Sequence, residues 1–64
     1  MNQEKIGKLI KEIRQKNNLT QKQFADKYGI TYQAVSKWEN GKNMPDVSLL
    51  KQISKDFKVN IEDL

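Results

Sequence analysis

The stretch from residue 19 to residue 41, LTQKQFADKYGITYQAVSKWENG, contains the pattern on which the fold depends. It predicts two short helices joined by a turn through Gly29, because glycine readily takes the positive φ that ends a helix. In the second helix, Val35 and Trp38 are spaced to face a core, and the opposite flank is polar. This is how a helix-turn-helix motif presents a reading helix to the DNA major groove.

Capping residues mark where these two helices begin. Thr20 and Gln23 form the capping-box pattern, so the first helix is expected to start after Thr20. Thr31 is a favourable N-cap for the second helix, which we expect to span about residues 32–40. The small side chain of Ala25 suits a steep crossing between the two helices. The inward positions of the first helix of the motif are Phe24, Ala25 and Tyr28.

Helices are also predicted on both sides of the motif. Residues 3–16 place apolar side chains on one helix face, namely Ile6, Leu9, Ile10 and Ile13. Gly7 interrupts this helix at a cost in helix propensity, which suggests the close approach of another helix. Asp46 is expected to cap a fourth helix that runs to about Asp56, and a last helical turn is expected from Asn60. The apolar side of the fourth helix is formed by Val47, Leu50, Ile53 and Phe57.

The chain has 64 residues, which suits one domain spanning residues 1–64. It contains neither Cys nor His, so its stability has to come from packing amphipathic helices. The net charge of +4 is uneven, since residues 1–42 contain nine Lys or Arg against four Asp or Glu. A positive potential over the motif favours a polyanion such as DNA, although a solubilising surface explains a charge of this size equally well.

Several classes of protein are disfavoured. No run approaches the roughly 20 apolar residues of a membrane span, and the N-terminus lacks a signal-peptide pattern, so a cytoplasmic protein without membrane contact is expected. The absence of His, Cys, a phosphate-binding glycine loop and paired carboxylates argues against an enzyme. Too few metal ligands have a workable spacing, so neither a metal site nor a cofactor is expected.

A set of short motifs occurs in a characteristic order. The motifs are Ile6-Gly7, Ile10 through Arg14, Leu19-Thr20-Gln21, the spaced residues Ala25, Gly29, Val35 and Trp38, the stretch SKWENG at 36–41 followed by Pro45, Leu49-Leu50 with Ile53, and residues 61–64. Through them the chain resembles, from about Ile6 to Leu64, the DNA-binding domain of the Cro/C1-type (xenobiotic-response-element, XRE) helix-turn-helix family. The resemblance implies an all-α fold of the lambda-repressor type, a compact bundle of four to five short helices. Phe24 and Ser54 replace the more usual Leu and Ala, and neither lies on the reading face.

The motif and the resemblance together assign the contacts with DNA. Base reading is expected from the outward flank of the helix at residues 32–40, with its N-cap: Thr31, Tyr32, Gln33, Ser36 and Lys37. Phosphate contacts are expected from Gln21, Arg14, Asn40, Lys42 and Asn43, with Gln21 as the phosphate-clamping glutamine that the resemblance implies. The resemblance also implies an ion pair between Arg14 and Glu39. It joins the helix at residues 3–16 to the end of the helix at residues 32–40. Trp38 is assigned to the core.

The same residues have structural interpretations as well. Gln33 is the strongest candidate for a base contact, through bidentate hydrogen bonds to adenine, but a solvated helix residue would look the same. Tyr32 could lie along its own helix, and Ser36 could bond to its own backbone. Lys37 could address guanine, but a phosphate is favoured over a base if it makes only one contact.

The function expected from these features is that of a sequence-specific DNA-binding transcriptional regulator, with repression as the expected role and operator DNA as the partner. A homodimer would place two reading helices about 34 Å apart on a palindromic site. The alternative is a protein-binding module, because the same domain occurs in antitoxins, and Met44, Ile61 and Leu64 could join such an interface. Many family members extend their fifth helix to dimerise, so the sequence is also compatible with a fragment of a longer regulator.

Overall fold

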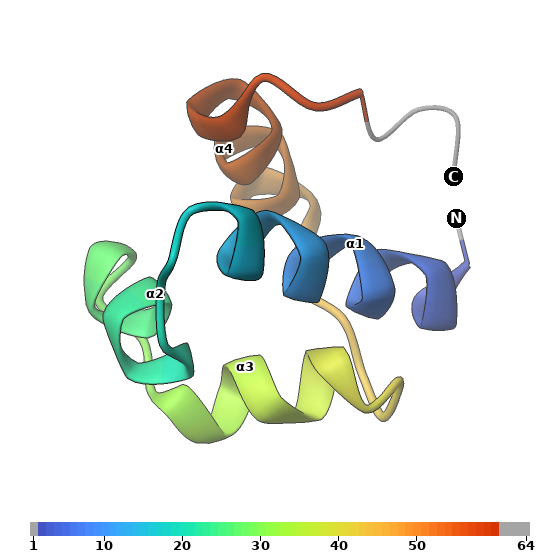
Figure 1. Cartoon of the computed structure of the whole chain (residues 1–64). Helices are drawn as coiled ribbons and strands as arrows, with labels where there is room; N and C mark the ends of the chain where they lie inside the picture. Colours follow the sequence, from blue (N-terminus) through green and yellow to red (C-terminus); the bar gives the residue numbers. More distant parts are fainter. Residues whose placement is uncertain (1, 61–64) are drawn as a thin grey trace.

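Four helices follow one another in the computed structural model, which describes residues 2–60. They are α1 (Gln3–Lys16), α2 (Gln21–Lys27), α3 (Tyr32–Glu39) and α4 (Val47–Phe57), and the described residues contain no strand. In Figure 1, α1 crosses the centre of the view, with α3 below it and α4 above it. The all-α fold and the order of the helices predicted from the sequence are confirmed. The helical turn expected beyond Asn60 lies outside the described residues.

Each helix begins where a short polar side chain accepts a backbone hydrogen bond. At α1, α3 and α4 these side chains are Asn2, Thr31 and Asp46. At α2 the capping box is complete, since Thr20 Oγ1 accepts the N–H of Gln23 at 3.0 Å and Gln23 Oε1 accepts that of Thr20 at 2.8 Å. Caps of this kind satisfy N–H groups that the helix itself leaves unpaired. The predicted helix starts are therefore confirmed.

The turn between α2 and α3 depends on a residue with left-handed backbone. Gly29 has φ of +65°, and the N–H of Ile30 bonds back to the carbonyl of Ala25 at 3.1 Å. A residue with a Cβ is strained in this conformation, whereas glycine takes it freely. The turn predicted at Gly29 is confirmed, and it fixes the direction in which α3 leaves α2.

One face of every helix contributes to a shared apolar core. Its buried side chains are Ile6, Ile10, Ile13, Phe24, Ala25, Val35, Trp38, Leu50 and Ile53. Removal of this apolar surface from water is the main favourable term in folding. Val47 differs from the expectation, because it is 55% exposed although it was predicted on the apolar side of α4. It is the first residue of α4, next to the N-cap Asp46.

The crossing of α1 and α3 requires a glycine. A Cβ placed on Gly7 would lie 2.1 Å from the backbone carbonyl oxygen of Trp38, far closer than any van der Waals contact. The close helix approach predicted from Gly7 is therefore confirmed. It brings the C-terminal end of α3 directly against α1, and this closeness positions the polar side chains that link the two helices.

A second set of contacts joins α2 to α4. The Phe24 and Phe57 rings stack with their centroids 5.8 Å apart, and Lys27 Nζ lies 5.7 Å from the Phe57 centroid. The Tyr28 hydroxyl donates to Asp56 Oδ2 at 2.8 Å. Burial and this bond raise the pKa of Tyr28 above its ordinary value, whereas the hydrogen bond from Tyr28 lowers the pKa of Asp56, helped by one from Gln52. These contacts hold α2 against α4.

Candidate nucleic-acid interface

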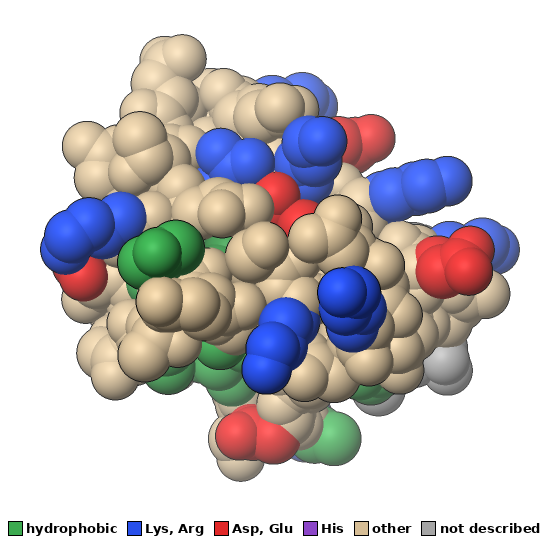
Figure 2. Space-filling model, turned by 90° about the horizontal axis from the view of Figure 1, so that it is seen from below, with side chains coloured by type: hydrophobic (Ala, Val, Ile, Leu, Met, Phe, Trp, Pro, Cys, Tyr) green, Lys and Arg blue, Asp and Glu red, His purple; other side chains and the backbone are tan. Residues whose placement is uncertain are grey.

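The outward flank of α3 is open to solvent along its first turns. Tyr32 is 50% exposed, and Thr31, Gln33 and Lys37 are also exposed, whereas Val35 on the opposite flank is completely buried. Figure 2 views the molecule from the α3 side and shows a largely polar surface on which Lys and Arg side chains are spread and hydrophobic groups cover little area. Four of the predicted base-reading residues therefore share one accessible polar flank.

The fifth predicted base-reading residue, Ser36, is half-buried and is engaged within its own helix. Asn40 Nδ2 donates to the carbonyl oxygen of Ser36 at 2.9 Å and lies 3.4 Å from its hydroxyl oxygen. Asn40 was predicted to bind phosphate, and in this structure its side chain caps the end of α3 instead of pointing away from the chain. Ser36 only accepts in this contact, so its hydroxyl hydrogen remains a donor, and Asn40 itself is exposed.

In the segment that follows α3, residues 41–43, side chains are more accessible to a ligand than backbone N–H groups. The N–H of Lys42 donates to the carbonyl of Lys37 at 2.9 Å, and that of Gly41 donates to the carbonyl of Trp38 at 3.0 Å. The backbone N–H of Lys42 is therefore occupied within the chain. The side chains of Lys42 and Asn43 are exposed, so a phosphate contact would come from them or from the Asn43 backbone.

A long-range contact holds this segment in place, and the sequence did not suggest it. Gln3 Nε2, in the first turn of α1, donates to the carbonyl oxygen of Gly41. The two residues are 38 positions apart, and a polar Gln in a first helical turn carries no signal of such a partner. The bond becomes evident only once the α1–α3 crossing at Gly7 is known.

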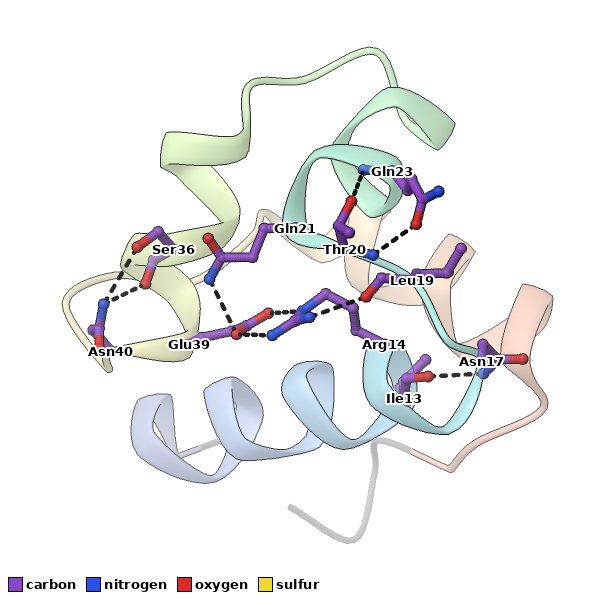
Figure 3. A network of polar contacts seen from close by, with 10 residues as sticks. All are labelled: Ile13, Arg14, Asn17, Leu19, Thr20, Gln21, Gln23, Ser36, Glu39 and Asn40. Carbon is purple, nitrogen blue, oxygen red and sulfur yellow. Dashed lines mark hydrogen bonds and ion pairs between the residues drawn. The ribbon is translucent and has the colours of Figure 1, made fainter.

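Arg14 and Glu39 form a bidentate ion pair between α1 and the end of α3, as Figure 3 shows. Arg14 Nε lies 2.7 Å from Glu39 Oε2, and Nη2 lies 2.9 Å from Oε1. Arg14 Nη1 also donates to the carbonyl oxygen of Leu19 at 3.0 Å. The two side chains are only 14% and 5% exposed. The structure thus brings together the two residues that the resemblance paired.

The Arg14 guanidinium remains charged over the ordinary pH range. The hydrogen bond from Arg14 to Glu39 raises the pKa of the guanidinium further above its already high value, although burial opposes the effect. Three of the five N–H donors of the guanidinium are occupied within the protein. Arg14 is therefore first a residue that joins helices, and only its remaining donors are available to a phosphate.

Gln21, the predicted phosphate-clamping residue, is the first residue of α2 and is half-buried. Its Nε2 donates to Glu39 Oε1 at 3.3 Å, so it joins the Arg14–Glu39 pair (Figure 3). The sequence did not predict this contact, because it depends on how α2 and α3 are oriented by the Gly29 turn. Together, Arg14, Gln21 and Glu39 link α1, α2 and α3 at one point.

The described residues hold no group of His, Cys, Asp or Glu arranged to bind a metal ion. Within the same residues, each helix is too short or too polar to cross a bilayer. The chemistry that this surface offers consists of amide, hydroxyl and ammonium donors on an exposed helix. Such donors address phosphates and the edges of bases.

The two helices α2 and α3, their glycine turn and the polar outward flank define a helix-turn-helix protein. The family model described as "Helix-turn-helix" matches residues 10–64. The chain belongs to this family, of the Cro/C1 type, so the resemblance found in the sequence is confirmed. Its fold is the lambda-repressor-like all-α fold of that family.

Several curated proteins are similar to the chain. It is 44% identical over 55 residues to the HTH-type transcriptional activator BcrR of Enterococcus faecalis, a match that covers 86% of the chain and 27% of that protein. It is 37% identical over 59 residues to the antitoxin PezA of Streptococcus pneumoniae, covering 92% and 37% respectively. An uncharacterised HTH-type transcriptional regulator of Methanocaldococcus jannaschii is 40% identical over 55 residues, covering 86% of the chain and 83% of that protein.

The first two relatives are much longer than the matched region, since the chain spans only 27% and 37% of their lengths. The similarity therefore concerns the helix-turn-helix unit that they share with the chain. One of them is named an activator and the other an antitoxin.

Proposed function

We propose that this chain is a sequence-specific DNA-binding transcriptional regulator that reads the major groove with α3. The observation that carries the proposal is the division of α3 into a buried flank and an exposed polar flank, with Val35 completely buried and Tyr32 half exposed. A helix divided in this way can enter a groove without disturbing the fold. The family membership supports the same function.

Within this proposal, base reading falls to the exposed residues of α3. Gln33 is suited to bidentate hydrogen bonds with adenine, Lys37 to guanine or a phosphate, and the Tyr32 ring to a thymine methyl group. Thr31 lies at the edge of the flank as the N-cap of α3. Ser36 keeps its hydroxyl hydrogen as a donor, but it is half-buried, so we place it behind the other residues in importance.

Phosphate contacts supply affinity in the same proposal. We assign them to Gln21, Lys42 and Asn43, and to the donors of Arg14 that Glu39 and Leu19 leave free. Asn40 Nδ2 carries two N–H donors, and Asn40 is exposed, so it would add a contact through a donor that Ser36 does not use. Since each neutralised phosphate releases counterions, affinity should fall steeply with salt.

We further propose repression, by occupation of an operator, as the role of the chain in transcription. Two copies on a palindromic site would place their α3 helices about 34 Å apart. One relative is named an activator, so the position of the selected site relative to a promoter decides between the two roles. A site that overlaps the promoter supports repression, whereas an upstream site supports activation.

The test of DNA reading is selection of bound sites from a random duplex pool, followed by Gln33→Ala on the best site. The expected result is loss of discrimination at one base position, worth about 1–3 kcal/mol. Lys51→Ala, a change on α4 away from the motif, is the matched control and should leave the base preference unchanged. Failure to enrich any site at physiological salt would contradict the proposal.

A protein-binding role is the second candidate, and the similarity to an antitoxin favours it. Met44 is half-buried against the core and offers part of its surface to such a partner. The same site selection separates the two functions. A chain that binds every duplex equally, and only at very low salt, would be better explained as a protein-binding module.

A further inference from the structure

The side chain of Gln21 is held by α3. Its Nε2 donates to Glu39 Oε1 at 3.3 Å across a separation of 18 residues. We infer that Glu39 is a positioning residue, which orients the amide of Gln21 toward a DNA phosphate. This inference rests on the proposed function, because it takes Gln21 as a phosphate contact, and it adds the residue through which that contact is prepared.

Glu39 is suited to this role because its carboxylate cannot turn freely. Both of its oxygens accept hydrogen bonds from Arg14, and its side chain is only 5% exposed. Arg14 is fixed in turn by the carbonyl oxygen of Leu19, two residues before Gln21. The acceptor that Gln21 meets is therefore anchored to α1 and to the connection between α1 and α2.

One contact to a fixed acceptor is enough to orient an amide group. The Gln21 amide carries two N–H donors and one acceptor oxygen in a plane. When one N–H is bonded to Glu39, the directions of the second N–H and of the oxygen are largely determined. A side chain held in this way loses less rotamer freedom when it binds a phosphate, and such preorganisation raises affinity.

The charge of Glu39 would oppose this role if the residue stood alone. A carboxylate next to a phosphate site repels the phosphate, and a buried carboxylate also needs a partner. Arg14 supplies one positive charge at 2.7 Å, so the pair as a whole is neutral. Glu39 can therefore accept a bond from Gln21 without adding net negative charge to the surface that faces DNA.

The alternative is that Glu39 only stabilises the fold, and a double-mutant cycle separates the two roles. Gln21→Ala is measured in the wild-type chain and in an Arg14→Met, Glu39→Met chain, which exchanges the pair for apolar groups of similar length. Replacement of both partners avoids the unpaired charge that a single replacement leaves. Arg14→Leu, Glu39→Leu, which also removes both the charge and the acceptor oxygens, is the second background if the methionine pair does not fold.

The readout is the dissociation constant for the selected operator, at a temperature where circular dichroism shows every variant folded. We expect Gln21→Ala to weaken binding about five- to tenfold in the wild-type chain, as for one hydrogen bond. In the background without Glu39, the same change should have little effect. Gln33→Ala is the matched control. Gln33 lies on the exposed flank, so its substitution should weaken operator binding by the same factor in both backgrounds.

Equal losses from Gln21→Ala in both backgrounds would overturn the inference and leave the proposed function intact. An independent measurement uses the Gln21 side-chain amide protons in the free chain by NMR. They are expected at shifted positions in the wild-type chain and at random-coil positions once Glu39 is replaced. Random-coil positions of these protons in the wild-type chain would also overturn the inference. Failure of the wild-type chain to prefer any operator would overturn the proposed function and the inference together.

Discussion

The two flanks of α3 differ in what they contribute to the molecule. On the inner flank, Val35 and Trp38 are buried, and the backbone of Trp38 lies against Gly7 of α1. On the outer flank, Tyr32 and Lys37 are exposed. The fold is therefore held by the inner flank, and the side chains of the outer flank are left for the DNA contacts that we propose.

Gly7→Ala should produce the largest loss of stability, because the new side chain would collide with the backbone on the inner flank of α3. The new Cβ would lie 2.1 Å from the carbonyl oxygen of Trp38, so α1 and α3 would have to separate. We expect a loss of about 3 kcal/mol or more in the free energy of unfolding, at the upper end for overpacking. Urea denaturation followed by circular dichroism measures it.

Gly29→Ala is the matched control for this prediction. Gly29 has φ of +65°, but a Cβ there would meet no atom within 4 Å. The substitution should therefore show only the left-handed strain, about 1–2 kcal/mol. Equal losses from the two substitutions would mean that the close crossing at Gly7 does not hold the inner flank.

Glu39→Gln should have the next largest effect on stability. It leaves Arg14 without its anionic partner, although Arg14 keeps the carbonyl of Leu19. We expect a loss of about 2–3 kcal/mol, somewhat below that of a fully buried pair, because Arg14 retains some contact with solvent. The measurement is again the free energy of unfolding in urea. A change below about 0.5 kcal/mol, typical of surface sites, would show that the pair contributes little to the fold.

Lys42→Gln should affect binding without affecting the fold, and it extends the comparison to the segment that follows α3. The Lys42 side chain is exposed, so the free energy of unfolding should change by less than about 0.5 kcal/mol. Loss of one phosphate contact should reduce the slope of log affinity against log salt by about 1. Lys51→Gln on α4 carries the same change of charge and should leave the slope nearly unchanged. Equal changes in slope would show that the lysines act only through the overall field.

Tyr28→Phe should have the smallest effect, and its pH dependence identifies the cause. The hydrogen bond from Tyr28 lowers the pKa of Asp56 below its ordinary value of 3.8. This contribution is fully present above that ordinary value, and it is lost as the pH falls through the lowered pKa of the folded state. The small stability difference between wild type and variant should thus stay constant between about pH 5 and 8 and shrink in acid. A difference that persists unchanged in strong acid would contradict this explanation.

Local signals in the sequence predicted most of the fold. The capping box of Thr20 and Gln23, the turn at Gly29 and the close approach at Gly7 each depend on neighbours in sequence or on the need for a missing side chain. The outward flank of α3 followed from the same periodicity, since Val35 and Trp38 fixed the opposite side.

Contacts between distant side chains could not be predicted in the same way. The bonds from Gln3 to Gly41 and from Tyr28 to Asp56 join residues 38 and 28 positions apart. They depend on the angles at which the helices dock, to within the short reach of a hydrogen bond. Gln21 shows the same limit, because its role as a first-turn residue was evident but its bond to Glu39 was not.

The most direct test of the two-flank account is NMR titration of the isotope-labelled chain with its selected operator. The account predicts that backbone and side-chain amide shifts change chiefly at residues 31–37, at Gln21 and at residues 42–43. Shifts of α4 should change little. Changes concentrated on α4, with residues 31–37 unaffected by an operator that binds, would contradict the claim that the outer flank of α3 is the surface that meets DNA.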